Sequence, residues 1–395
     1  MSKLARLTGR WRAVPILGLT QILAWGSLFY PPVLTLPLLA AERGISLTFA
    51  MAGFSFGLLT GGFVAPKVGR LIDRYGGHRV MAAGSLSGAL GLVLLVHTSN
   101  PILYLAVWAL LGAAMAASLY DPAFATLGRI FGREARKPIT LLTFVGGFAS
   151  TVSWPTTYFL LEVYGWRGTY LIYAALLVLV AAPMHFFALP RERADLRAQE
   201  NDPGAPVPKL IPARGSAFLL VAAAFAIYAF VPSALSAHML AIFDRMGVGS
   251  GTVILIGALF GPAQVTARLC EFMFARNRHP IDIARFAIGL LLFAFLLLAA
   301  LGVPAPVAAT FAILFGITNG LLTISRGTVP LALFGPSGYG GVLGRIAGPS
   351  LVLQAAAPLV VAFAAERASD AVALAIIAGM TAVSFAAFLA VRKPT

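Results

Sequence analysis

The stretch GRLIDRYGGHR, residues 69–79, separates two long apolar runs of the chain. The first run ends near Pro66 and the second begins near Val80. Apolar runs of about 20 residues are long enough to cross the hydrocarbon core of a membrane as helices. We therefore expect residues 69–79 to form a short, basic, glycine-rich loop between two membrane-spanning helices.

The composition of the whole chain also indicates a membrane protein. Of its 395 residues, 59% are hydrophobic and 11% are charged, whereas a soluble chain carries roughly 25% charged residues. So few polar residues cannot cover a water-soluble body. The first apolar run is too long for the core of a cleavable signal peptide. A single cysteine, Cys270, excludes an internal disulfide.

Hydropathy predicts an all-α integral membrane protein with twelve membrane-spanning helices. The polar, proline-containing segment 189–214 is expected to be a partly disordered linker on the side of the termini. It divides the chain into six-helix bundles at 1–188 and 215–395. The expected spans are 13–40, 46–66, 80–98, 101–127, 139–163, 168–188, 215–242, 250–273, 283–302, 306–331, 343–366 and 371–391.

The basic residues lie mainly on one side of this topology. Of the 29 lysines and arginines, only Arg43, Arg167, Arg245 and Arg367 fall on the side opposite the termini. This bias predicts that both termini are cytoplasmic, as in a multi-pass protein of the inner cell membrane. The net charge of +15 is thus explained by topology. Nucleic acid is not expected as a partner, because no basic and aromatic soluble module is present.

The two halves resemble copies that lie about 202 residues apart. Residues 42–44 after the first expected span match residues 244–247 after the seventh. The stretch 69–79 has only a degraded counterpart in the second half, in which Asp73 aligns with Ala275. Parallel repeats of this kind are typical of some transporter folds.

Residues 69–79 resemble the signature loop of the major facilitator superfamily, Gly-x-Leu-x-Asp-Arg-x-Gly-x-x-Arg, and match it at every fixed position. The resemblance implies a transporter of two six-helix repeats, with its substrate site between them and helices 1, 4, 7 and 10 lining the cavity. It also implies that Gly69, Asp73, Arg74 and Arg79 act in gating, with Asp73 at the start of helix 11. A solvated turn with basic anchors is the alternative.

Ionisable residues inside the expected spans are candidates for function, because charge is costly in a membrane. Asp121 is the first candidate for a proton site, with a fixed salt bridge as the alternative. Arg326 lies at nearly the matching place in the second half, where it binds an anionic substrate, pairs with Asp121 or extends to lipid phosphate. His238 is a second candidate for proton coupling, with a structural role as the alternative.

Gln264 and Arg268 lie one helical turn apart on the eighth expected span. This span resembles the eighth helix of monocarboxylate and oxalate-type transporters. The resemblance implies that Arg268 binds the substrate carboxylate. In the animal carriers an aspartate precedes the arginine by four residues, and here Gln264 stands at that place. The proton step would then move to Asp121 or His238. A charge at the rim of the membrane is the alternative for Arg268.

Other polar and aromatic residues are expected to line the substrate site. The pair Pro31-Pro32 breaks the first span, and broken helices line cavities in transporters. Ordinary packing or anchoring at the membrane surface is the alternative for each residue. The candidates are Gln21, Trp25 and Tyr30 on the first span, Tyr120 on the fourth and Asn319 on the tenth.

No nucleotide-binding loop, zinc spacing or nucleophile elbow occurs in the sequence. We therefore expect no enzyme, cofactor or metal site. The sequence predicts a monomeric secondary transporter that moves a small organic anion, carboxylate-like in chemistry, with proton coupling and with membrane lipids around it. The nearest alternative is a proton-driven exporter of amphipathic compounds, because the expected lining is aromatic. A receptor on the same scaffold, which moves no solute, is the other class considered.

Overall fold

The structure, a computed structural model, describes residues 9–191, 212–275 and 277–393. These residues form helices and connecting turns, with no strand among them. The chain divides into two compact units: unit 1 is Met1–Val207 with Gly335–Gly348, and unit 2 is Pro208–Phe334 with Pro349–Thr395. Residues 192–211, most of the expected linker, lie outside the described part, and the expected bundle boundaries stay a prediction.

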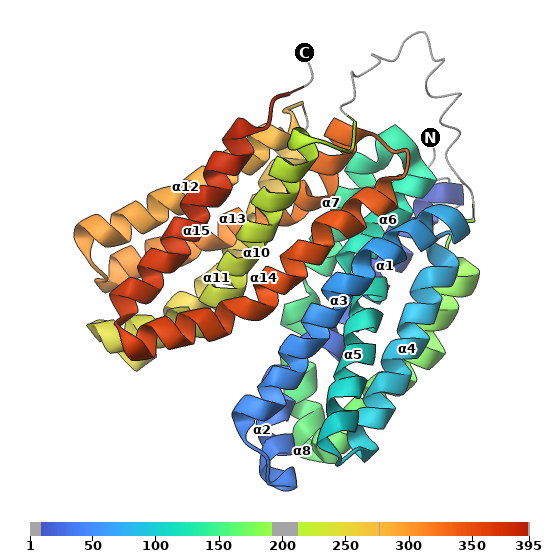
Figure 1. Cartoon of the computed structure of the whole chain (residues 1–395), viewed down its shortest axis with the longest axis horizontal. Helices are drawn as coiled ribbons and strands as arrows, with labels where there is room; N and C mark the ends of the chain where they lie inside the picture. Colours follow the sequence, from blue (N-terminus) through green and yellow to red (C-terminus); the bar gives the residue numbers. More distant parts are fainter. Residues whose placement is uncertain (1–8, 192–211, 276, 394–395) are drawn as a thin grey trace. The chain divides into compact units, whose positions relative to one another are not determined.

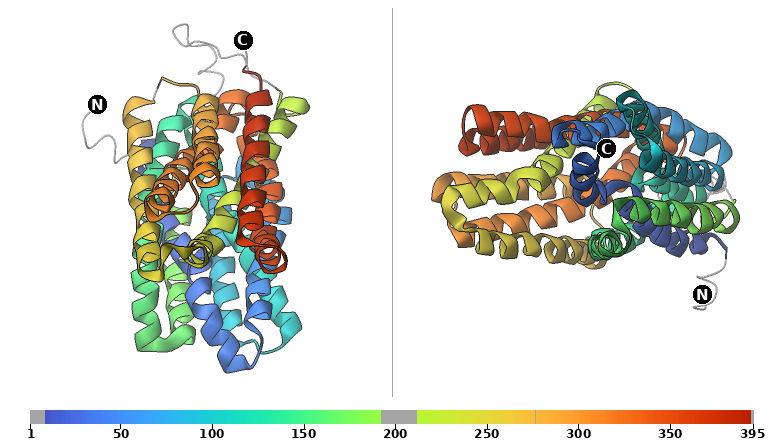
Figure 2. Two further views of the ribbon diagram at one scale, coloured as in Figure 1. Left: turned by 90° about the vertical axis from the view of Figure 1, so that its left-hand side faces the viewer. Right: turned by 90° about the horizontal axis from the view of Figure 1, so that it is seen from below.

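Unit 1 contains the helices of the first half of the chain, and the first turns of α14 belong with it (Figure 1). Within the unit, the helices lie alongside one another (Figure 2). They are η2 Gly9–Arg12, α1 Ala13–Ala24, η3 Trp25–Phe29, α2 Pro32–Arg43, α3 Leu47–Tyr75, α4 Gly77–His97, α5 Pro101–Ser118, α6 Tyr120–Phe131, η4 Gly132–Ala135, α7 Arg136–Gly146, α8 Ala149–Leu176, η5 Leu177–Ala181 and η6 Met184–Ala188.

Unit 2 is built from long helices of the second half, most of which match one expected span each to within a few residues (Figure 1). The helix α14 starts in unit 1 and continues into unit 2 from Pro349. The helices are α10 Ser216–Phe243, η7 Asp244–Val248, α11 Ser250–Phe274, α12 Pro280–Leu301, α13 Ala305–Phe334, α14 Tyr339–Arg367 and α15 Asp370–Ala390.

Ten helical stretches of the described residues are long and apolar enough to cross a membrane. One of them, Pro101–Ala188, has 88 residues and includes three of the expected spans. It is interrupted at Leu119, which is extended, and at Gly165, whose φ of 63° is not helical. The all-helical membrane fold is confirmed, whereas the number of twelve spans stays a prediction.

The charged stretch at 69–79 is mostly helical, which corrects the expectation of a loop. Helix α3 continues to Tyr75, and α4 begins at Gly77. Only Gly76 lies between them, with a φ of 86° that favours glycine. The physical reason is that a helix keeps its backbone hydrogen bonds after it leaves the apolar region, so the charged residues extend α3 by more than two turns.

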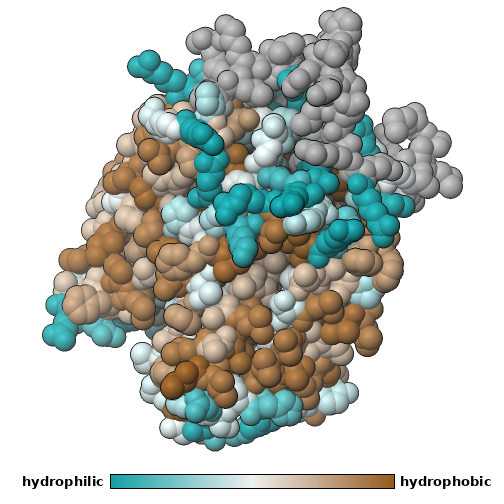
Figure 3. Space-filling model, turned by 45° about the vertical axis from the view of Figure 1, so that its right-hand side comes forward, coloured by the Kyte–Doolittle hydropathy of each residue, from teal (hydrophilic) through white to brown (hydrophobic). Residues whose placement is uncertain are grey.

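The surface of unit 1 shows the pattern expected of a membrane protein. In the lower right part of Figure 3, hydrophobic side chains form a broad band, with hydrophilic residues at the end of the unit below it. Several large apolar residues of unit 1 are exposed, among them Phe63, Ile102 and Phe187. Such a surface is unfavourable in water and favourable in contact with lipid.

Candidate functional site: a broken helix, a buried arginine and a close helix contact at glycine

Span 4 of the sequence prediction is broken between α5 and α6. Pro122 has no backbone N–H, so the carbonyl of Ser118, four residues earlier, has no intrahelical donor. The side chain of Gln21 on α1 supplies one, because its Nε2 donates to the Ser118 carbonyl oxygen at 2.7 Å. Gln21 and Ser118 are both buried. The break is therefore stabilised by a polar contact from another helix, as irregular backbone in a membrane requires.

Aromatic residues expected to line the site lie together beside this break. Trp25 Nε1 donates to Gln21 Oε1 at 3.1 Å. The Trp25 ring lies 5.3 Å from the ring of Tyr120 and 5.8 Å from that of Tyr30, measured between centroids. Tyr30 in turn lies 6.1 Å from Trp154. The structure thus brings three expected wall residues of unit 1, together with Trp154, into one cluster beside a hydrogen-bonded glutamine.

The first expected span is also irregular where this cluster lies. Residues Trp25–Phe29 form a π-helix, η3, and Tyr30 and Pro31 separate it from α2. Single-turn π-helices are frequent at functional sites, because the wide turn exposes backbone and redirects side chains. The interruption occurs at the proline pair that the sequence indicated.

Asp121 lies in the first turn of α6, directly after the break. The unpaired N–H groups and the dipole of a helix N-terminus favour a negative charge there. The side chain is half-buried, and its charge acts on the buried Tyr339 at the start of α14. The sequence placed Asp121 on a continuous fourth span at 101–127, and the extended residue Leu119 interrupts that span.

In unit 2, three side chains of α10 bind polar groups of neighbouring helices. Tyr228 Oη donates to Asn319 Oδ1 at 3.2 Å. Ser233 Oγ donates to the Gln354 carbonyl at 2.8 Å, and Pro358, four residues after Gln354, provides no N–H for that carbonyl. The last contact joins His238 Nε2 and the Pro358 carbonyl, 2.9 Å apart. His238 therefore has a structural hydrogen bond, the alternative considered for it.

Arg268 lies in the interior of the molecule on α11, with 3% of its surface exposed. Glu271, three residues later on the same helix, is also buried, at 4%. Residues three apart are neighbours on a helix surface, so a buried cation and a buried carboxylate share one face. Gln264, one turn before Arg268, is half-buried, and Cys270 beside them is exposed.

Glu271 was missed as a candidate, because the repeat aligns it with Gly69 and so places it in the degraded counterpart of residues 69–79. Its position inside α11, before the helix ends at Phe274, explains its burial. The available signal was the spacing Arg268-x-x-Glu271 at the end of an apolar run. Arg326 is half-buried on α13. Asp121 belongs to unit 1 and Arg326 to unit 2, so their expected pairing stays a prediction.

The carboxylate of Asp73 binds the first turn of α14 with both oxygens. Oδ1 accepts from the Gly340 N–H at 2.9 Å and Oδ2 from the Gly341 N–H at 2.7 Å. The backbone carbonyl of the same residue accepts from Arg129 of α6. These contacts use donors that the helix leaves unpaired, and the helix dipole favours the negative charge.

Gly69 allows this contact because α3 and α14 approach at backbone distance. A Cβ at Gly69 would overlap the carbonyl oxygen of Gly340, which α14 presents to α3. A side chain on this face of Gly69 would therefore separate the two helices. Arg74, by contrast, is exposed and stacks over its neighbour Tyr75, with 5.1 Å between its Cζ and the ring centroid. Arg79 is exposed as well. The structure joins Gly69 and Asp73 to α14, and the gating role of all four residues stays a prediction.

A model of the Major Facilitator Superfamily matches residues 16–344. The chain belongs to this superfamily. The match includes the stretch 69–79 and the broken helix, so it confirms the family that the signature motif indicated. Multi-pass membrane location follows from the family together with the long apolar helices.

Curated relatives of this superfamily member are transporters, not enzymes. Monocarboxylate transporter 11 of Mus musculus is 33% identical over 122 residues, which are 31% of this chain and 26% of that protein. The human transporter 11 is 29% identical over 230 residues, 55% and 46% of the two chains. Monocarboxylate transporter 4 of Rattus norvegicus is 26% identical over 311 residues, 75% and 63% of them. The chain thus spans less than half the length of the first two.

Solved structures share the fold. The human organic anion transporter MFSD10 superposes with a TM-score of 0.71 at 18% identity, over 96% of this chain and all of that one. The proton:xylose symporter XylE superposes with a TM-score of 0.69 at 12% identity, over 98% and 97% of the two chains. These similarities define the architecture and leave the substrate to be argued from residues.

Proposed function

We propose that this protein is a secondary active transporter that moves a small organic anion, carboxylate-like in chemistry, by alternating access with proton coupling. Membership in the superfamily supports transport, and the names of the relatives, monocarboxylate transporters, support the anion. The sequence carries no motif for using ATP. The energy therefore comes from a gradient of protons or of the solute itself.

The observation that carries the proposal is the burial of Arg268. A guanidinium group stays protonated in a protein and binds a carboxylate through two parallel hydrogen bonds. Burying this cation in a membrane helix, at 3% exposure, is costly unless an anionic group binds it. We assign Arg268 as the anchor of the substrate carboxylate, with Gln264 as a neutral hydrogen-bonding neighbour on the same face.

Proton coupling needs a carboxylate or histidine that changes its protonation during the cycle. Asp121 is the first candidate, because it lies at the broken helix beside the aromatic cluster. Glu271 is a second candidate, because it is buried three residues from Arg268. His238 is the weakest, since its ring nitrogen lies at hydrogen-bonding distance from a backbone carbonyl.

The aromatic cluster of unit 1 favours a second candidate function, the proton-driven export of amphipathic compounds. Trp25, Tyr30, Tyr120 and Trp154 form a surface suited to flat, partly apolar molecules. An exporter of that kind would not depend on Arg268. We prefer the anion carrier because burying an arginine in a membrane helix costs free energy, whereas aromatic rings pack there without such a cost.

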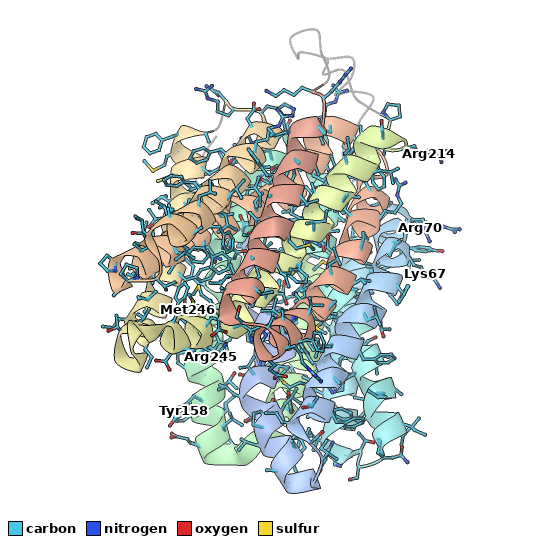
Figure 4. All side chains as sticks on the ribbon, turned by 60° about the vertical axis from the view of Figure 1, so that its left-hand side comes forward. Lys67, Arg70, Tyr158, Arg214, Arg245 and Met246 are labelled. Carbon is cyan, nitrogen blue, oxygen red and sulfur yellow. The ribbon has the colours of Figure 1, made fainter. Side chains whose placement is uncertain are left out.

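The test is uptake by the purified protein in liposomes loaded with a pH-sensitive dye, across a panel of small monocarboxylates. The native protein should acidify the lumen when a carboxylate gradient is applied. Arg268→Gln should lower the flux at least about tenfold, the loss expected for one charge-assisted hydrogen-bonding partner. Arg70→Gln is the matched control, because Arg70 is exposed on α3 and extends away from the helix (Figure 4).

Each outcome of this experiment discriminates between the functions. Carboxylate-dependent flux that is lost with Arg268→Gln and kept with Arg70→Gln supports the anion carrier. Absence of flux with every carboxylate, together with proton-driven efflux of aromatic amphiphiles, supports the exporter. Substrate binding without movement of any solute would identify a receptor on this scaffold.

A further inference from the structure

A groove lined only by aliphatic side chains runs along the surface of unit 1 between α4 and the end of α8 with η5. Its volume is about 530 Å³. Several of its lining residues are well exposed, for example Leu86, Leu90 and Leu179 at 50%, 54% and 73%. The groove is therefore open to the surroundings of the protein. In a protein that spans a membrane, apolar chains of lipid are available to fill such a groove.

One face of α4 leads from this groove to a positive charge. Arg79, Ala83, Leu86 and Leu90 are all exposed and follow one another at spacings of four, three and four residues. That spacing keeps them on one face of a helix. With a rise of 1.5 Å per residue, Leu86 lies about 10 Å below Arg79 along the helix axis, and Val93 about 21 Å.

A second cation lies just after the helical stretch 149–188, which forms the other side of the groove. Arg191 lies three residues after the end of η6 and is exposed. The charges of Arg191 and Arg79 both act on His78 at the start of α4. The His78 ring also contacts Phe186 of η6, with 6.4 Å between the centroids. The cluster of His78, Arg79 and Arg191 therefore connects α4 with η6, and η6 continues the helical stretch of α8 and η5 that forms the other side of the groove.

A phospholipid whose headgroup lies at Arg79 is long enough for its acyl chain to enter the groove. The hydrocarbon core of a bilayer is roughly 30 Å thick, so an acyl chain reaches about 15 Å below the headgroup. The groove begins about 10 Å below Arg79 and continues past that depth. Basic residues at the membrane surface attract anionic headgroups, and basic pockets between membrane helices bind them.

We propose that this seam of unit 1 binds one anionic phospholipid of the surrounding membrane, with its phosphate on Arg79 and Arg191 and an acyl chain in the aliphatic groove. The substrate argued above is small and polar, so it has no affinity for an aliphatic groove. The lipid site is independent of the proposed transport function, because lipid binding is measured without transport.

The test uses the full chain, purified from membranes and exchanged into detergent micelles with equal amounts of phosphatidylglycerol and phosphatidylcholine. Native mass spectrometry then counts the lipids that remain bound. The native protein should keep one phosphatidylglycerol in preference to phosphatidylcholine. A basic residue near the membrane surface changes the affinity for an anionic lipid by about fivefold. Arg79→Gln with Arg191→Gln should therefore lower the preference about 25-fold.

Two further variants separate the headgroup from the chain. Ala175→Trp fills the groove at an exposed alanine, so it should reduce binding of both lipids without disturbing the core. Lys67→Gln with Arg70→Gln removes the same charge from α3, where both side chains extend outward (Figure 4), and should leave the preference unchanged. Equal retention of the two lipids by the native protein would overturn the proposal. An equal loss in the α3 control would do so too, because it would show that only total charge matters.

Discussion

Arg245 holds Asp370 through two parallel hydrogen bonds, from Nε to Oδ2 at 2.9 Å and from Nη2 to Oδ1 at 2.6 Å. This pair joins the end of the first long helix of unit 2 to the start of α15. Unit 1 has a corresponding pair, in which Arg167 binds Glu42 and Trp166 Nε1 donates to the same carboxylate at 2.5 Å. In both units the partners are 125 residues apart. The acidic and basic partners have exchanged places between the repeats.

Arg245→Ala should destabilise unit 2 by a small amount. Arg245 is about half exposed, and Figure 4 shows it beside Met246 at the tip of the unit. For so exposed a pair, solvent screening limits the loss to about 0.5–1 kcal/mol. The measurement is the thermal unfolding midpoint of the purified protein. The reciprocal exchange, Arg245→Asp with Asp370→Arg, should restore most of the midpoint. A double variant less stable than both single ones would show that the pair has no such role.

Gly69→Ala should disrupt the junction of α3 and α14. The new methyl group would overlap the Gly340 carbonyl, so the helices must separate and the contacts of Asp73 lengthen. Overpacking of this kind costs about 1–3 kcal/mol. We expect a lower unfolding midpoint and slower transport. Gly379→Ala on α15 is the control, because nothing lies within 4 Å of a Cβ there. If both variants behave alike, the close approach at Gly69 is not required.

Gln21→Leu should lower the stability of the protein at the break between α5 and α6. It leaves the Ser118 carbonyl buried without its donor, which costs about 1–3 kcal/mol. It also removes the acceptor of Trp25 Nε1, so the indole fluorescence of the cluster should change. Ser233→Ala makes the equivalent change at Gln354 in unit 2 and should lower the midpoint without altering that fluorescence. An unchanged midpoint in Gln21→Leu would mean that water replaces the lost donor.

Glu271→Gln and Asp121→Asn should distinguish the two candidates for the proton site. Each variant keeps the shape of the side chain and removes its ability to carry a proton. The variant at the true site should lose proton flux while still exchanging labelled substrate across the membrane, because exchange needs no net proton movement. The measurement compares the two activities in the same liposomes. If both variants keep their proton flux, the proton is carried by the substrate or by His238.

Much of the architecture was predictable, because the length and hydropathy of a membrane-spanning segment and the charge of its flanks are properties of whole segments. The spans of unit 2 agree with the helices to within a few residues. The sequence failed where local geometry depends on a distant partner. Pro122 alone does not predict a break at Leu119, because the break also depends on Gln21, which is far away in the chain.

The candidate site was predicted in part for the same reason. Trp25, Tyr30 and Tyr120 were expected to line one site because of the broken first span and the family resemblance, and they lie together. Glu271 was missed, because burial at the end of a helix depends on the neighbouring helices rather than on residue type. The boundary of α3 was placed too early, because hydropathy marks the edge of the membrane and not the end of a helix.

The exposed Cys270 has a practical consequence. It is the single thiol of the chain and lies between Arg268 and Glu271 along α11. A fluorophore attached there would sit within one turn of the proposed anion anchor without any engineered attachment point. The unmodified polypeptide thus carries its own labelling handle, and ligand titrations by fluorescence become possible on the wild-type background.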